Sequence, residues 1–185
     1  MAAASDPAAA AAVPRTLVLM RHAEAFPGPY GDPSPSSDLG RPLTPVGRRQ
    51  AHERGTQLRE IGFIPELVLI SPAMRSGETY AAFGPFSTTA VPQVRQDGRL
   101  YECGSESILE VLQETPENFN NIIVIGHNPD LYQLVMDLAG HAIDDPDKSI
   151  LIRGFPVASL ACFTVHGPWH ALARKQAVLT RALCN

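Results

Sequence analysis

The chain has 185 residues, of which 44% are hydrophobic, and this length suits one domain with a sizeable core but not two. The 18% of charged residues and the mean hydropathy of −0.04 predict a soluble globular protein. No apolar run reaches the roughly 20 residues that a membrane-spanning helix needs. The net charge of −4 argues against nucleic acid as a partner, because proteins that bind it usually carry a surplus of basic residues.

The N-terminal stretch 1–15 (MAAASDPAAAAAVPR) lacks the basic segment and the leucine-rich core of a signal peptide. We therefore expect a disordered tail over 1–15, a single domain over 16–185 and a cytoplasmic protein without a membrane partner. Cys103, Cys162 and Cys184 show no CxxC spacing, which predicts neither a disulfide framework nor a zinc site. The sequence predicts no metal and no cofactor, and it leaves the oligomeric state open.

Three short runs rich in Val, Ile and Leu share one design, which is typical of strands covered on both faces. The second run leads into a helical pattern after Ser71-Pro72, and the third leads into one after Asn128-Pro129. Strands that alternate with helices predict an α/β fold in which a mostly parallel sheet is covered by helices on both faces. The runs are TLVLM (16–20), ELVLI (66–70) and NIIVI (121–125).

Four helices are expected, and their starts carry recognisable signals. Ser71 and Asn128 are good N-cap residues followed by proline, and Thr44-Pro45 repeats this signal. Ser107 with Glu110 three residues later forms a capping-box pattern. The expected helices run from Thr44 to about Ile61 with Gly62 after it, from Ser71, over 105–114, and from Asn128.

The remaining segments are less regular. PVASLACFTV (156–165) and WHALARKQAV (169–178) predict two late strands with a Gly-Pro turn between them, one of them an antiparallel edge. The stretch 26–42 is rich in Pro, Gly and Ser, and irregular segments of this length are often functional or disordered. It is either a wall or lid of a site or a floppy insertion.

Four polar residues follow the apolar runs at the edge of the sheet where ligands of open α/β folds bind. Arg21 and His22 end the first run, Arg75 lies one turn into the helix after the second, and His127 follows the third after one glycine. Each residue alone also fits an ordinary structural or solvent-exposed role. Together they predict one shared site, and helix N-termini at the same edge favour an anion there.

The chemistry of these residues suits phosphoryl transfer through histidine. A neutral imidazole is a competent nucleophile near pH 7, and a covalent intermediate on it is chemically accessible. Arg21, Arg75 and a second histidine would neutralise the oxygens of the phosphoryl group. A carboxylic acid would protonate the leaving oxygen, and we expect Glu102 in this role, with Glu106 as the alternative.

Other phosphate chemistries lack their motifs. No GxxxxGK[ST] loop occurs, so a P-loop nucleotidase is excluded. A cysteine phosphatase would need an arginine six residues after its nucleophile, and neither Cys103 nor Cys162 has one. No HExxH pattern appears. The other histidines show no ligand spacing and are expected at the surface: His52, His141, His166 and His170.

Four segments, in order, resemble motifs of the histidine phosphatase superfamily, also called phosphoglycerate mutase-like. They are LVLMRHAEA (17–25), RPLTPVGRRQA (41–51), LVLISPAMRSGETY (67–80) and IIVIGHNPDL (122–131), which together cover most of 16–138. FPVASLACFTV (155–165) is similar to the small branch that includes bacterial phosphohistidine phosphatases. The resemblance implies a three-layer α/β/α fold for the domain at 16–185.

The resemblance also implies roles. His22 would be the phosphorylated nucleophile, with Arg21, Arg75 and His127 completing the catalytic phosphate pocket and Glu102 at the usual place of the proton donor. The implied reaction is metal-free dephosphorylation of a phosphorylated protein, with phosphohistidine as the expected group, or of a small phosphorylated metabolite. A phosphoglycerate mutase-type phosphotransferase and a binding module without turnover are the alternatives.

Overall fold

One of the two central strands of the sheet is β1 (Arg15–Arg21), whose inner residues are buried on both faces. Leu17 and Leu19 face one half of the core, and Val18 and Met20 face the other. This burial explains the continuous apolar run, because a strand covered on both faces has no polar side. The computed structural model describes residues 14–28, 34–140 and 146–184.

The strands form one sheet in the order β3-β2-β4-β1-β5-β6. The first four pair in parallel, whereas β5 pairs antiparallel with β1, and β6 antiparallel with β5. The other strands are β2 (Leu67–Ile70), β3 (Gln93–Gln96), β4 (Asn121–Gly126), β5 (Leu160–Val165) and β6 (Ala177–Leu183). The predicted mostly parallel α/β architecture is therefore confirmed.

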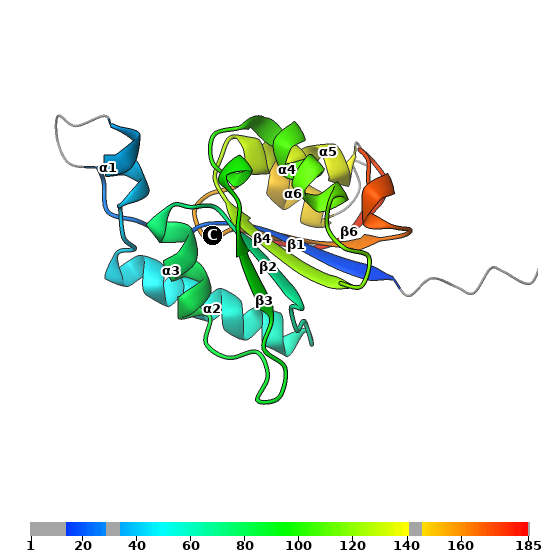
Figure 1. Ribbon diagram of the computed structural model, residues 1–185, viewed down its shortest axis with the longest axis horizontal. Helices are drawn as coiled ribbons and strands as arrows, with labels where there is room; N and C mark the ends of the chain where they lie inside the picture. The colour runs from blue at the N-terminus through cyan, green and yellow to red at the C-terminus, as the bar shows by residue number, and fades with distance from the viewer. Residues whose placement is uncertain (1–13, 29–33, 141–145, 185) are drawn as a thin grey trace, which may run out of the picture.

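Helices cover both faces of the sheet, as Figure 1 shows. One layer holds α2 (Pro45–Glu60) and α3 (Met74–Ala82), and the other holds α4 (Gly104–Gln113), α5 (Asp130–Ala139) and α6 (Pro146–Ile152). The short α1 (Pro35–Leu39) lies apart from both layers (Figure 1). Two 3₁₀ turns complete the elements, η1 (Gly98–Leu100) and η2 (Trp169–Ala171). No helix among the described residues is long and apolar enough to cross a membrane.

The helix at Thr44 agrees with its prediction, but other helix starts differ. Thr44 caps α2 by accepting a hydrogen bond from the Gly47 amide at 2.9 Å. The helices expected from Ser71 and Asn128 begin later, at Met74 and Asp130. Ser71 Oγ accepts from the Ala73 amide at 3.3 Å, but both side chains also bond outside the helix start. Ser71 Oγ contacts His127, and Asn128 Nδ2 donates to Phe155 O. The capping box is wrong: Ser107 lies inside α4 and donates to Cys103 O.

Three further segments differ from expectation. The last strand covers Ala177–Leu183 and not 169–178, because Trp169 turns into the core as part of η2 and is fully buried. The polar edge strand β3 carries no apolar run and was not predicted. Within 26–42 the structure places α1, while 29–33 lie outside the described residues.

The N-terminal prediction reaches beyond what the structure describes. Residues 1–13 of the tail expected over 1–15 lie outside the described residues. Arg15, which was assigned to that tail, instead begins β1 and pairs with Val165 of β5.

Candidate active site

The four residues predicted from the strand ends meet at the carboxyl edge of the sheet. Arg21 lies opposite Gly126 in the parallel β1–β4 pair, and the His22 amide donates to Gly126 O at 3.0 Å. This register brings His22 beside His127, with 4.9 Å between the ring centroids. His22 is 8% exposed and His127 is 7% exposed, so the pair is buried.

Arg75 joins the two imidazoles from the first turn of α3. Its Nε donates to His22 Nε2 and its Nη2 to His127 Nδ1, both at 3.3 Å. Arg75 is itself 4% exposed. A guanidinium has donors only, so both contacted ring nitrogens are acceptors. The edge of Arg75 formed by Nε and Nη2 therefore faces both histidines.

The partners of the two rings fix their tautomers. His22 Nδ1 lies 2.7 Å from Ala23 O, which only accepts, so Nδ1 carries the proton and Nε2 keeps its lone pair. His127 Nδ1 is an acceptor, so its Nε2 carries the proton and donates to Ser71 Oγ at 2.6 Å. Ser76 Oγ lies 2.9 Å from Ser71 Oγ and extends this chain. His22 thus presents an unprotonated nitrogen to Arg75.

Burial keeps both imidazoles neutral. It lowers the pKa of His22 to about 4, and the charges of Arg75, Arg21 and Arg41 act in the same direction. The pKa of His127 is lowered to about 3 by burial, with His22 and Arg75 adding to the effect. At neutral pH the site therefore contains two uncharged imidazoles among positive guanidinium groups, which suits an anion.

The guanidinium of Arg21 makes one hydrogen bond within the described part of the chain, from Nη1 to Phe155 O at 3.1 Å. Its Nε is buried and has no hydrogen-bond partner among the described residues. Burial, together with Arg75, lowers the pKa of Arg21. Leaving a buried charged donor unpaired is costly, so this atom indicates a place for an acceptor from outside the chain.

Asp38 is a site residue that sequence reasoning missed. Its Oδ2 accepts hydrogen bonds from Arg75 Nη2 at 2.9 Å and from the Tyr101 hydroxyl at 2.5 Å. Burial opposes ionisation of Asp38, but the bonds from Tyr101, Arg75 and Arg41 outweigh it and lower its pKa to about 2. The only sequence signal was the spacing of Asp38 and Arg41, a pair that lies in an irregular stretch.

Among the described residues, neither of the two predicted acids makes a hydrogen bond to the four pocket residues. Glu102 is exposed, with φ 54°, and among the described residues its carboxylate makes no hydrogen bond to the pocket. Its neighbour Tyr101 reaches the site instead, with its ring 5.2 Å from that of His127. Glu106 pairs with Arg174, which also contacts Asp137 in the last turns of α5, at the opposite end from His127.

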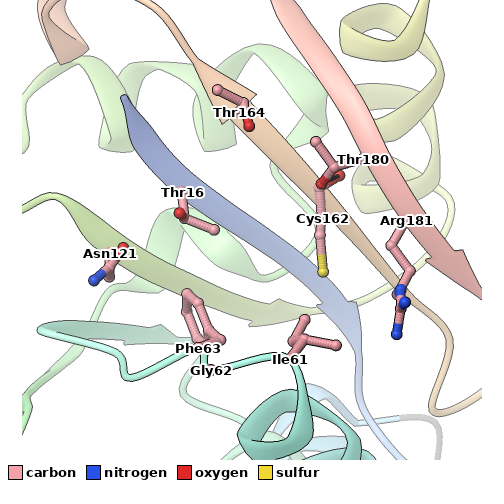
Figure 2. A pocket seen from close by; sticks show the side chains of 9 residues that line it. All are labelled: Thr16, Ile61, Gly62, Phe63, Asn121, Cys162, Thr164, Thr180 and Arg181. Carbon is pink, nitrogen blue, oxygen red and sulfur yellow. Dashed lines mark hydrogen bonds between the residues drawn. The ribbon is translucent and has the colours of Figure 1, made fainter. Parts of the chain in front are cut away.

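The other histidines follow their prediction where they are described: His52, His166 and His170 are exposed. His141 lies outside the described residues. In the part of the chain that the structure describes, no three or more His, Cys, Asp or Glu residues form a group suited to a metal ion. A hollow of about 320 Å³ lies near the start of β1, and none of the predicted site residues lines it (Figure 2).

Comparisons with known proteins agree with this geometry. No protein-family model matches the chain. An uncharacterised protein of Mycobacterium tuberculosis is 30% identical over 153 residues, covering 81% of this chain and 89% of that protein. A SixA protein of Nakamurella multipartitia, assigned as a phosphohistidine phosphatase, is 31% identical with a TM-score of 0.78, covering 93% of this chain and 96% of that one.

A mycobacterial glucosyl-3-phosphoglycerate phosphatase shares the fold at 17% identity, with a TM-score of 0.62 and coverage of 94% of this chain and 100% of that one. The fold and the cluster of two imidazoles and two guanidinium groups define a phosphoglycerate mutase-like protein, and the chain belongs to the histidine phosphatase superfamily. Within the superfamily, its similarity to SixA extends over nearly the whole chain. The resemblance drawn from the sequence motifs is confirmed.

Proposed function

We propose that the protein is a metal-independent phosphatase that transfers a phosphoryl group to His22 Nε2 and then to water. The observation that supports this most directly is the neutral, buried His22, whose Nε2 lone pair faces the Nε edge of Arg75. The reaction needs no cofactor. The catalytic unit is the domain at 16–185, and its proposed setting is the cytoplasm.

The first step is an in-line displacement at phosphorus. The lone pair of His22 Nε2 forms the N–P bond while the bond to the leaving group breaks, and that electron pair goes to the leaving atom. Arg21 Nε and the edge of Arg75 formed by Nε and Nη2 would bind the equatorial oxygens, with His127 beside them. Water then attacks the phosphorus, the N–P bond breaks with its electron pair returning to His22 Nε2, and the oxygen and protons of the water leave with inorganic phosphate.

The leaving group distinguishes the two substrate classes. An alkoxide leaving from a phosphate ester needs a proton, for which Glu102 is the proposed acid. The imidazole of a phosphohistidine leaves as a neutral ring when its other nitrogen is protonated, so it needs no acid. The exposed Glu102, together with the similarity to SixA, favours phosphohistidine on a protein as the substrate.

A small phosphorylated metabolite is the second candidate. It is favoured by the shared fold of a phosphatase that acts on glucosyl-3-phosphoglycerate. For such an ester the acid matters, so Glu102→Gln should slow turnover of sugar phosphates by about 10²-fold or more and leave phosphohistidine turnover nearly unchanged.

The test is to incubate the purified protein with a phosphohistidine-bearing protein domain and, separately, with sugar phosphates and p-nitrophenyl phosphate. We expect release of phosphate from the protein substrate and a phosphoenzyme that mass spectrometry maps to His22. Turnover of sugar phosphates alone would reject the protein substrate, and dependence on a bisphosphorylated primer would indicate a mutase.

Two variants make the test specific. His22→Ala should abolish both turnover and the phosphoenzyme, with a loss of about 10⁴-fold or more. His170→Ala removes an exposed histidine paired with Glu117 and should change neither. If the wild-type protein binds phosphate but turns over no substrate, the chain is a binding module.

A further inference from the structure

The two edges of the Arg75 guanidinium have different partners. The edge formed by Nε and Nη2 faces the ring nitrogens of His22 and His127. The edge formed by Nη1 and Nη2 is held by one residue, Asp38, through its main-chain oxygen at 2.8 Å and its carboxylate at 2.9 Å. One residue thus binds the outer edge of Arg75 and leaves the inner edge to the pocket.

Asp38 is itself fixed from two further directions. Oδ1 lies 2.7 Å from both Nε and Nη2 of Arg41, and Oδ2 accepts from Tyr101 as well as from Arg75. A carboxylate oxygen has about two acceptor positions, and both of those on Oδ2 are occupied, by Tyr101 and Arg75. Oδ1 is engaged by Arg41. The carboxylate is therefore suited to holding its neighbours and not to proton transfer.

The network joins segments that are far apart in sequence. Asp38 belongs to α1, Arg75 to α3, and Tyr101 follows η1. The Tyr101 ring completes the cluster, with its centroid 5.2 Å from that of His127 and 5.8 Å from the central carbon of the Arg75 guanidinium. A guanidinium group that is already held at one edge loses little conformational freedom when its other edge binds an anion.

We propose that Asp38 is a positioning residue, which holds the outer edge of Arg75 so that the inner edge faces the phosphoryl group on His22. The role rests on the proposed function, because it assigns Arg75 to the phosphate pocket. It also gives the described residues 34–42 a part in the site, since α1 carries Asp38 to the pocket.

The charge balance of the site supports the same role. Arg21, Arg41 and Arg75 are three positive groups close to His22, and Asp38 is the negative group that contacts two of them. Arg75 is buried, whereas the Asp38 side chain is 34% exposed. Without the Asp38 carboxylate the guanidinium would keep only the main-chain oxygen of residue 38 on its outer edge and would be free to turn away from the imidazoles.

The test is a double-mutant cycle in the full-length protein. Asp38→Ala should lower kcat by about 10²-fold, and Asp38→Asn, which keeps one acceptor, should lower it by less. In the Arg75→Ala background the same Asp38→Ala change should cost less than about threefold, because the partner it positions is gone. An equal loss in both backgrounds would overturn the proposal.

A second readout separates this inference from the proposed function. Binding of inorganic phosphate, measured by calorimetry, requires no turnover, and Asp38→Ala should weaken it in the wild-type background and not in Arg75→Ala. Phosphate binding that Asp38→Ala leaves unchanged would overturn the positioning role, even if turnover is observed. If the wild-type protein turns over no substrate but shows this pattern, the proposed function fails and the positioning role stands.

Glu117→Gln is the matched control. Like Asp38, this carboxylate receives several hydrogen bonds and pairs with an arginine, Arg15, and its pKa is lowered to about 2. It lies near the start of β1, at the opposite end of the strand from the site. The control variant should keep wild-type kcat and wild-type phosphate affinity.

Discussion

The two ends of β1 each carry an arginine, and the two guanidinium groups are held in opposite ways. At the start of the strand, Arg15 Nη1 donates to Gly167 O at 2.7 Å and pairs with Glu117 at 2.7 Å. At the end of the strand, the Arg21 guanidinium donates one hydrogen bond within the described residues, to Phe155 O, and its Nε is buried without a partner there.

The difference separates an arginine that stabilises the fold from one that binds a ligand. Arg15 meets acceptors within the chain and lies over Trp169, with 5.5 Å to the ring centroid, so its interactions are complete. The buried Nε of Arg21 has lost its contacts with water and has no hydrogen bond in their place, which lowers the stability of the free protein. An incoming anion would recover that cost, and this is the pattern expected where binding energy is used for catalysis.

Among changes at the two ends of β1, the largest expected effect comes from removing each arginine in turn. Arg21→Ala removes a donor to the phosphoryl oxygens and should lower kcat/KM by about 10²–10³-fold, with little loss of stability. Arg15→Ala should leave kcat/KM unchanged and lower the free energy of unfolding by about 1–3 kcal/mol, because it breaks several hydrogen bonds. Steady-state kinetics and urea unfolding of both variants measure this. Equal effects on activity would remove the distinction.

Sequence reasoning reached the residues whose position follows from the strands. Arg21 and His127 each lie at the end of a recognisable apolar run, and parallel strands bring such ends together. Asp38 and Tyr101 were missed because their contact spans 63 residues and depends on how two irregular segments pack. The last strand was misplaced for a similar reason, since only the packing of Trp169 shows that 169–171 turn inward.

The pH dependence should reveal the neutral imidazoles at the catalytic end. Because burial lowers the pKa of His22 to about 4, activity should stay level on the acid side until the pH falls through about 4, where the nucleophile becomes protonated. The unfolded chain binds this proton already near pH 6.5. His22 alone should therefore lower the free energy of unfolding by about 3 kcal/mol as the pH falls from 6.5 to 4, and His127, whose pKa is also lowered, adds to this fall.

The midpoints of urea unfolding between pH 7 and pH 4.5 measure the predicted loss of stability. His22→Gln removes one of the buried imidazoles, so its midpoint should depend less on pH than that of the wild-type protein. A wild-type activity profile that declines already near pH 6.5 would show that His22 titrates as an exposed histidine does, and the contrast between the two ends would lose its electrostatic basis.

A smaller effect is expected from two glycines near the site. Gly47 of α2 packs so closely against the backbone of Glu24, two residues after His22, that a Cβ atom would collide with it. Gly47→Ala should therefore cost about 1–3 kcal/mol of stability and displace the chain that follows the nucleophile. At Gly77 of α3 a Cβ atom would meet no other part of the described chain within 4 Å, so Gly77→Ala should be neutral or stabilising by up to about 1 kcal/mol. Urea unfolding compares the two.

The smallest effect is expected at the hollow of about 320 Å³ near the start of β1 (Figure 2). Its polar groups include the side chains of Thr16, Thr180 and Arg181, and the last two residues are exposed. Solvent satisfies exposed groups without cost, so Arg181→Ala should leave kcat/KM within about twofold and stability within about 0.5 kcal/mol of wild type. Phosphatase assays of this variant beside Arg21→Ala measure the contrast. A loss approaching that of Arg21→Ala would mean that the two ends of the sheet are coupled, because Arg181 touches none of the groups around His22.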